Sequence, residues 1–287
     1  MNLLVGTSAG AFSLDDPSTP LVAGRINHIS RQEASWWAVD GEGGVHHNGE
    51  FVVKGPDGVS LNCVQPTRET VWVGAEAARL FRLEDGVLLE DDGFVDAPGR
   101  DGWYTPWGGP PDVRSMAFDA AGTLFVNIHV GGILRYDQDG LVPTIDQDSD
   151  VHQVITHPTR PGSVLAACAH GLAESSDGRN FAYRDEGLHA TYCRAVAIVG
   201  DKVLLSVSTG PRSNRARLYR SELGGGPFAE CREGLPEWFD DNLDTHCLAV
   251  VDGSVFAGHG GTVWRSDDEG GSWVEVASGL ARITCLS

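Results

Sequence analysis

The segment "RITCLS", residues 282–287, is a short strand-like run with no partner strand after it. The segment "LLVGTSAG", residues 3–10, is a strand and glycine turn with no strand before it. Because open sheet edges invite unwanted pairing, the two segments are expected to pair and to complete one sheet. The two ends of the sequence therefore predict a closed ring.

The residues between these ends repeat one pattern. Strand, glycine turn and strand recur seven times, at 3–14, 36–47, 71–83, 123–136, 164–175, 203–221 and 255–266. A second set of seven short strands lies at 25–30, 60–65, 112–118, 150–155, 191–198, 244–250 and 282–287. A spacing of roughly 40 residues is typical of four-stranded propeller blades. The sequence therefore predicts an all-β fold, one seven-bladed β-propeller domain over residues 1–287, in which the C-terminal inner strand pairs with the three N-terminal strands.

Composition limits the partners. The chain has 40 acidic against 21 basic residues and a formal net charge of -19, so its field repels nucleic acids and anionic membranes. The six cysteines form no CxxC pair and are expected to be buried free thiols. The N-terminus has no basic and apolar leader pattern, and no run reaches membrane-spanning length, so a cytoplasmic location is expected.

Two turns carry a further motif. "SDDEGGSW", residues 266–273, fits the S-x-D-x-G-x-x-W Asp-box, and "SSDGRNF", residues 175–181, fits a version one residue shorter. The chain resembles the BNR/Asp-box propellers, a group that includes sialidase-like hydrolases and photosystem II assembly factors. "TPWGGPPDVRS", "HVGGI", "DVHQVITHP" and "YCRAVA" resemble a bacterial family labelled as WD/YVTN/BNR-like repeat proteins or, loosely, as glycosyl hydrolases. The Asp-box itself predicts a structural role, in which Ser and Asp bond the turn backbone and Trp packs between sheets.

Polar residues gather where the inner strands begin, at one end of the central channel, here called the axial mouth. Aligning the seven inner strands gives one polar or thiol residue in each at this level: Asn27, Asn62, Arg114, His152, Cys193, His246 and Thr284. Two residues further along each strand, the same column is apolar. The gradient along the strands predicts a polar site at the axial mouth.

Histidines dominate this predicted site. His152 and His246 come from inner strands, and His129, His170 and His259 come from turns on the same face. Imidazole is the commonest metal ligand, so these five are the predicted ligands of a transition metal such as Cu, Zn, Fe or Mn. Asp150 and Asp244 are placed to orient the imidazoles. The alternative is that the histidines satisfy buried backbone groups between blades.

Long connections cross the same face. Residues 96–111 and 234–244 bring aromatic side chains, and the extended turn at 208–217 adds arginines. Aromatic groups with a few charges are typical of a small-molecule site. The predicted substrate-binding residues are Trp103, Tyr104, Trp107, Trp238 and Tyr192. The alternative is that these loops pack on one another as a lid.

Three functions remain open. The first is a metal-dependent enzyme or metal-binding protein, in which Arg114, Arg194, Asp150 and Asp244 act with the metal on a small molecule. The second is a non-catalytic propeller that binds a protein or peptide. The third, which the resemblance implies, is a sialidase-type glycosidase using Arg25, Arg114, Arg194, Arg282 and Tyr192. The sequence departs from that pattern because no Glu accompanies Tyr192 on the inner strands and the blades number seven instead of six.

Overall fold

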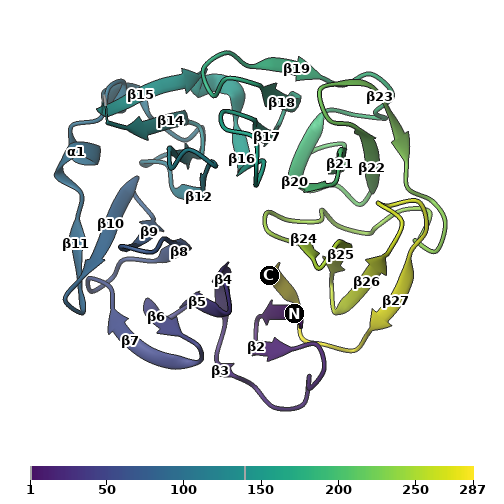
Figure 1. The fold of residues 1–287 in the computed structure, drawn as a ribbon, viewed down its shortest axis with the longest axis horizontal. Helices are drawn as coiled ribbons and strands as arrows, with labels where there is room; N and C mark the ends of the chain where they lie inside the picture. The colour runs from purple at the N-terminus through teal and green to yellow at the C-terminus, as the bar shows by residue number, and fades with distance from the viewer. Residues whose placement is uncertain (1, 139) are drawn as a thin grey trace.

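The computed structural model describes residues 2–138 and 140–287. Seven four-stranded antiparallel sheets stand around a central axis, one blade after another in chain order (Figure 1). The predicted all-β, seven-bladed propeller is confirmed. No helix within the described ranges is both long enough and apolar enough to cross a bilayer.

The first four blades contain sixteen strands. Blade one contains β28 (Ile283–Leu286), β1 (Leu4–Thr7), β2 (Gly10–Ser13) and β3 (Val22–Ala23). Blade two contains β4 (Ile26–Gln32), β5 (Ser35–Asp40), β6 (Gly44–His47) and β7 (Glu50–Lys54). Blade three contains β8 (Leu61–Pro66), β9 (Val71–Ala75), β10 (Arg79–Glu84) and β11 (Val87–Glu90). Blade four contains β12 (Val113–Phe118), β13 (Leu124–Ile128), β14 (Gly132–Asp137) and β15 (Gly140–Ile145).

The last three blades contain twelve strands. Blade five contains β16 (Val151–Thr156), β17 (Val164–Cys168), β18 (Gly171–Ser175) and β19 (Ala182–Arg184). Blade six contains β20 (Tyr192–Val199), β21 (Lys202–Ser208), β22 (Ala216–Glu222) and β23 (Gly225–Glu230). Blade seven contains β24 (Leu248–Val251), β25 (Ser254–His259), β26 (Thr262–Ser266) and β27 (Val274–Ala277). Short helical turns α1 (Asp92–Val95), η1 (Arg100–Gly102) and η2 (Gln147–Ser149) lie in the connections before blades four and five.

The two ends of the chain close the ring. Strand β28 pairs antiparallel with β1, and Leu4 and Ser287 exchange backbone hydrogen bonds of 2.7 and 3.0 Å. The termini accordingly lie side by side near the axis (Figure 1). This is the predicted pairing, and it leaves blade one with the four strands that its neighbours have.

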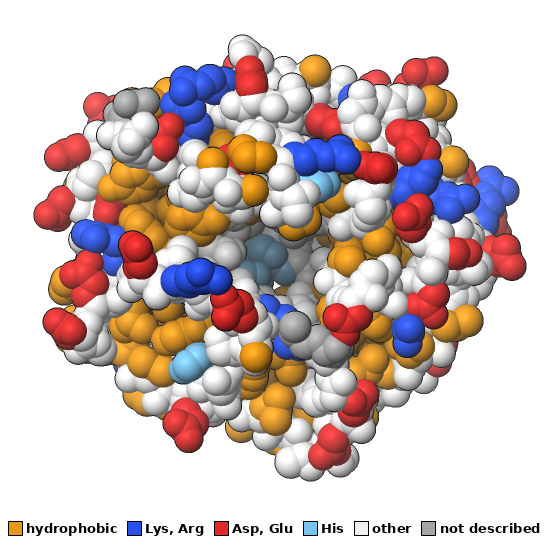
Figure 2. Space-filling view, viewed as in Figure 1, with side chains coloured by type: hydrophobic (Ala, Val, Ile, Leu, Met, Phe, Trp, Pro, Cys, Tyr) orange, Lys and Arg blue, Asp and Glu red, His pale blue; other side chains and the backbone are white. Residues whose placement is uncertain are grey.

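The apolar core lies between the blades. Seven buried clusters occur among the described residues, and each joins one blade to the next. In the cluster between blades six and seven, for example, Leu204 packs with Val255 and Trp273. Because the apolar contacts lie between sheets, the axis is left to polar side chains, and the molecule is hollowed there with histidine visible inside (Figure 2).

Both Asp-boxes form turns between the third and outermost strands of a blade. Ser266 Oγ donates to Asp268 Oδ1 (2.8 Å) and accepts from the Gly270 N–H (2.8 Å), while Trp273 Nε1 donates to the Gly270 carbonyl (3.3 Å). In the shorter version, Ser175 Oγ accepts from the Gly178 N–H at 2.9 Å. These bonds stabilise the turns, as the sequence predicts for the motif.

The inner strand of blade seven is shorter than predicted. Residues 244–250 were expected to form it, but β24 begins at Leu248. His246 has a φ of +67°, and the Cys247 N–H donates to the Asp244 carbonyl at 3.0 Å. A left-handed residue inside a tight turn cannot continue a β ladder, so the strand starts after it.

Candidate functional site

Bulges at the start of the inner strands turn one side chain of each toward the axis. The ladder register shifts around Asn27, Asn62, Arg114 and His152, so each is an extra residue between two paired neighbours. In β20 the shift lies between Cys193 and Val196. A bulge bends the strand and redirects the extra side chain. The prediction of Cys193 in the polar column is therefore wrong by one position: Cys193 is fully buried, and Arg194 lines the central cavity instead.

Side chains of the preceding blade satisfy backbone groups that the bulges free. The Val64 N–H donates to His28 Nδ1 (3.1 Å), and the Val154 N–H donates to Ser115 Oγ (2.9 Å). Gln153 Oε1 accepts from the N–H of Val196 at 3.2 Å and of His246 at 3.3 Å. The first three bonds join neighbouring blades at the level of the site, and the bond between Gln153 and His246 joins blade five to blade seven. They give His28 a structural role that pattern reading from the sequence missed.

Three predicted site residues converge beside the axis. His129 Nε2 lies 2.9 Å from Asp150 Oδ1, and His152 Nε2 lies 3.6 Å from the same oxygen. One ligand atom from each residue falls within 4.8 Å of the other two. Asp150 precedes β16 with a φ of +47°, which turns its carboxylate back toward His129 at the end of β13. We call these three residues the His–Asp cluster.

Two atoms of the His–Asp cluster are buried without an aligned hydrogen bond. Among the described residues, neither Asp150 Oδ1 nor His152 Nε2 has a partner in hydrogen-bond geometry. His152 Nδ1 donates to the Cys193 carbonyl at 2.6 Å, which fixes the tautomer and leaves the Nε2 lone pair free. A hydrogen bond from the other ring nitrogen to a carbonyl is the usual way to orient a metal-binding imidazole. Two imidazole nitrogens and one carboxylate oxygen thus fit the donor set of a transition metal.

The electrostatics of the His–Asp cluster favour neutral imidazoles and an ionised carboxylate. Burial, followed by the charge of Arg114, lowers the pKa of His152 to about 3. Burial also lowers the pKa of His129, although Asp150 acts in the opposite direction. Burial alone would raise the pKa of Asp150, but the neighbouring histidines and Arg114 lower it. Neutral imidazoles and an ionised carboxylate are the forms that bind metals.

The predicted substrate-binding aromatics divide into two groups. Two flank the His–Asp cluster: the Trp107 ring lies 5.3 Å from His129, and the Tyr192 ring lies 4.7 Å from His152. Trp103 is buried against Phe94 in the core between blades three and four, and Trp238 lies under the guanidinium of Arg217. Tyr104 is exposed and, within the described ranges, makes no ring contact or hydrogen bond with the cluster. The long connections therefore contribute both a lid-like core and one aromatic wall.

The other three predicted ligands lie apart from the His–Asp cluster. His170 is exposed, and His259 Nε2 bonds Asp240 Oδ1 (2.7 Å) in a separate surface cavity. The ring of His246 lies against that of His28 in a tilted arrangement, with centroids 3.9 Å apart. None of the three joins the cluster of ligand atoms found among the described residues.

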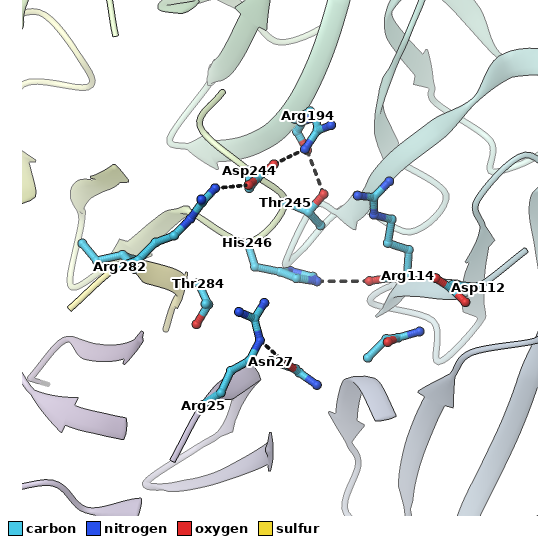
Figure 3. A pocket seen from close by; sticks show the side chains of 12 residues that line it. Arg25, Asn27, Asp112, Arg114, Arg194, Asp244, Thr245, His246, Arg282 and Thr284 are labelled. Atoms are coloured by element: carbon cyan, nitrogen blue, oxygen red, sulfur yellow. Dashed lines mark hydrogen bonds and ion pairs between the residues drawn. The ribbon is translucent and has the colours of Figure 1, made fainter. Parts of the chain in front are cut away.

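The remaining predicted catalytic residues line the central cavity. Arg194 forms an ion pair with Asp244 and donates to the Tyr192 hydroxyl at 3.3 Å. Asp244 also lies 3.7 Å from Arg282. Arg114 occupies the same cavity, and its backbone carbonyl accepts from His246 Nε2 at 3.3 Å (Figure 3). Asp244 therefore neutralises arginines, and among the described residues it makes no hydrogen bond or ion pair with an imidazole of the kind predicted for it.

The buried pair His28 and His246 makes the fold sensitive to acid. Burial lowers the pKa of His246 to about 4 and, with the charge of His246, lowers that of His28 well below its usual range. Between about pH 6.5 and 4 the unfolded chain binds more protons than the native chain, so stability falls as the pH falls. For His246 alone the loss between about pH 8 and pH 5 is roughly 2 kcal/mol.

Between about pH 8 and pH 5, we expect the His246→Asn variant to lose roughly 2 kcal/mol less stability than wild type, because it lacks the buried imidazole. Asparagine tolerates the positive φ at this position. The urea-unfolding midpoints of wild type and variant at each pH measure this difference. His170→Asn is the control, because His170 is exposed. Equal pH slopes in wild type and His246→Asn would contradict the assignment.

Comparison with known proteins shows the fold. No family model matches the chain, and no curated protein matches it. Virginiamycin B lyase from Staphylococcus aureus is 12% identical over 87% of this chain and 83% of its own, with a TM-score of 0.62. A putative 6-phosphogluconolactonase from Bacteroides uniformis is 12% identical over 99% and 98%, with a TM-score of 0.62. The WD40 propeller domain of Doa1 is 15% identical over 94% and 83%, with a TM-score of 0.61. At these identities the likeness establishes a propeller and leaves activity to the site.

Proposed function

We propose that the protein is a metal-binding, metal-dependent enzyme whose centre is the His–Asp cluster. The observation that carries the proposal is the convergence of two imidazoles and one carboxylate, with His152 Nε2 and Asp150 Oδ1 buried and lacking aligned hydrogen bonds to described residues. Buried polar groups are costly when unpaired, and metal ligation satisfies both atoms. Three protein ligands leave positions open, which is typical of catalytic sites.

The ligand set narrows the chemistry. Two histidines and one carboxylate are the ligands of catalytic zinc and of non-haem iron, and manganese and copper accept similar donors. A metal held by His129, Asp150 and His152 would supply Lewis acidity to a bound substrate oxygen. Trp107 and Tyr192 would form the apolar walls beside it. That a propeller can hold a small molecule is supported by the catalytically inactive virginiamycin B lyase solved with quinupristin.

A sialidase-type glycosidase has weaker support. Three of the four arginines proposed for a carboxylate-binding cluster already have partners: Arg25 bonds Asn27, Arg194 pairs with Asp244, and Arg282 pairs with Asp241 and Asp244. The Tyr192 hydroxyl accepts from the Arg194 guanidinium. A nucleophilic tyrosine needs a base beside it, and this contact offers a cation.

Elemental analysis tests the proposal. Tag-free protein, reconstituted separately with Zn²⁺, Fe²⁺, Mn²⁺ and Cu²⁺ and desalted, is expected to retain close to one equivalent of at least one metal. The His129→Ala/His152→Ala variant is expected to retain none, because it removes two of the three ligands. His170→Ala is the matched control, since His170 is exposed outside the cluster, and circular dichroism checks the fold of each variant. A wild type that retains no metal overturns the proposal and favours a propeller that binds a protein or peptide.

A further inference from the structure

A cavity of about 470 Å³ occupies the axis next to the His–Asp cluster. Six of the inner segments each contribute one axial side chain to it: Asn27, Asn62, Arg114, Arg194, His246 and Thr284. Figure 3 shows the labelled members of this set, which are all of them except Asn62, around a common space. The seventh inner strand contributes His152, which belongs to the His–Asp cluster.

One guanidinium in this cavity has no hydrogen-bond or ion-pair partner among the described residues. Arg194 and Arg282 are paired with carboxylates, whereas the Arg114 side chain makes no hydrogen bond or ion pair with any described residue. In Figure 3 no interaction is drawn from its guanidinium. Burial and the nearby charge of Arg194 lower the pKa of Arg114, while the charges of Asp244 and Asp150 act in the opposite direction.

Two further polar atoms in the same cavity are also unsatisfied. Asn62 Nδ2 and Thr284 Oγ1 are buried and have no hydrogen-bond partner among the described residues. An amide nitrogen is a donor only, and a hydroxyl can donate. Together with the planar guanidinium of Arg114, they form a set of donors facing a cavity that lacks an acceptor. A group rich in acceptors and negatively charged would satisfy all three.

We propose that this cavity binds a small carboxylate-bearing molecule, with its carboxylate held by Arg114 and by the donors Asn62 and Thr284. The guanidinium fork matches a planar carboxylate in bidentate geometry. Asp112 and Asp244 also line the cavity, and they disfavour the higher charge of a phosphate dianion. The proposal that the cavity binds a carboxylate does not depend on the metal centre. The proposal that this carboxylate belongs to the substrate rests on the proposed function, because the metal centre lies beside the cavity.

Isothermal titration of chelator-treated protein with succinate tests this site without metal. Saturable binding is expected, with no binding of the neutral analogue succinamide and weaker binding of inorganic phosphate. Arg114→Gln is expected to weaken succinate binding by at least about tenfold, since it removes a charged bidentate donor. Arg68→Gln is the matched control, because the Arg68 side chain is 86% exposed and pairs with Glu33 at the surface.

A second variant keeps the test valid if Arg114→Gln fails to fold. Asn62→Leu retains the guanidinium and removes an amide nitrogen that has no partner, so a smaller loss of succinate binding is expected from a folded protein. Absence of saturable succinate binding by wild type, equal binding by folded Arg114→Gln, or tighter binding of phosphate than of succinate would each overturn the proposal. If the protein binds succinate but retains no metal, only the proposed metal centre is overturned. If it retains metal but does not bind succinate, only the proposed carboxylate site is overturned.

Discussion

Deleting residues 282–287 is expected to abolish cooperative folding of the ring. Strand β28 buries Ile283, Cys285 and Leu286 to 5% exposure or less, and its loss would leave the β1 edge unpaired in the middle of the propeller. Losing buried Ile and Leu side chains costs about 2–5 kcal/mol each, before the lost backbone hydrogen bonds are counted. Domains of this kind have about 5–15 kcal/mol of total stability, so the deletion removes much or all of it.

Urea unfolding followed by tryptophan fluorescence measures this effect. Arg282→Ala is the control in the same segment, because the Arg282 side chain is 62% exposed and its ion pairs contribute little to stability. Its midpoint is expected to stay close to that of wild type. A deletion variant that unfolds in one transition at a native midpoint would show that the ring does not depend on the pairing of its ends.

The fold could be predicted because the evidence for it is repeated. Each blade carries the same alternation of strand and glycine turn, and the unpartnered segments at 3–10 and 282–287 match each other. An error in one copy, such as the late start of β24, leaves the period intact. Ring closure depends on the total number of blades and not on the bounds of any one strand, so a local error does not change the prediction of a closed ring.

The site could be predicted only in outline. The alignment placed Arg114 and His152 toward the axis, but it put Cys193 where Arg194 lies, because a bulge adds a residue that a period of two does not reveal. Asp150 was expected to orient an imidazole, and its Oδ1 lies 2.9 Å from His129 Nε2, but the sequence could not show that a φ of +47° brings the same oxygen within reach of His152 as well. Which histidines share a cluster depends on such local dihedrals and on contacts across blades.

Metal binding is expected to stabilise the protein, and the effect should depend on Asp150. A ligand bound only by the native state adds about 2.7 kcal/mol at one hundred times its Kd and about 4.1 kcal/mol at one thousand times. For a chain of this size that corresponds to a rise in Tm on the order of 5–10 °C. The metal that elemental analysis identifies should produce this rise in wild type, and a chelator should reverse it.

Asp150→Asn should lose most of that rise. The amide keeps the shape of the side chain and tolerates the positive φ, but it lacks the charge that a metal ligand supplies. Asp148→Asn is the matched control, because Asp148 is exposed two residues earlier and lies outside the His–Asp cluster. Differential scanning calorimetry with and without metal measures the shift in all three proteins. If Asp150→Asn gained as much as wild type, the metal would be bound elsewhere; if only Asp150→Asn lost the gain, metal binding would be coupled to folding at the mouth of the ring.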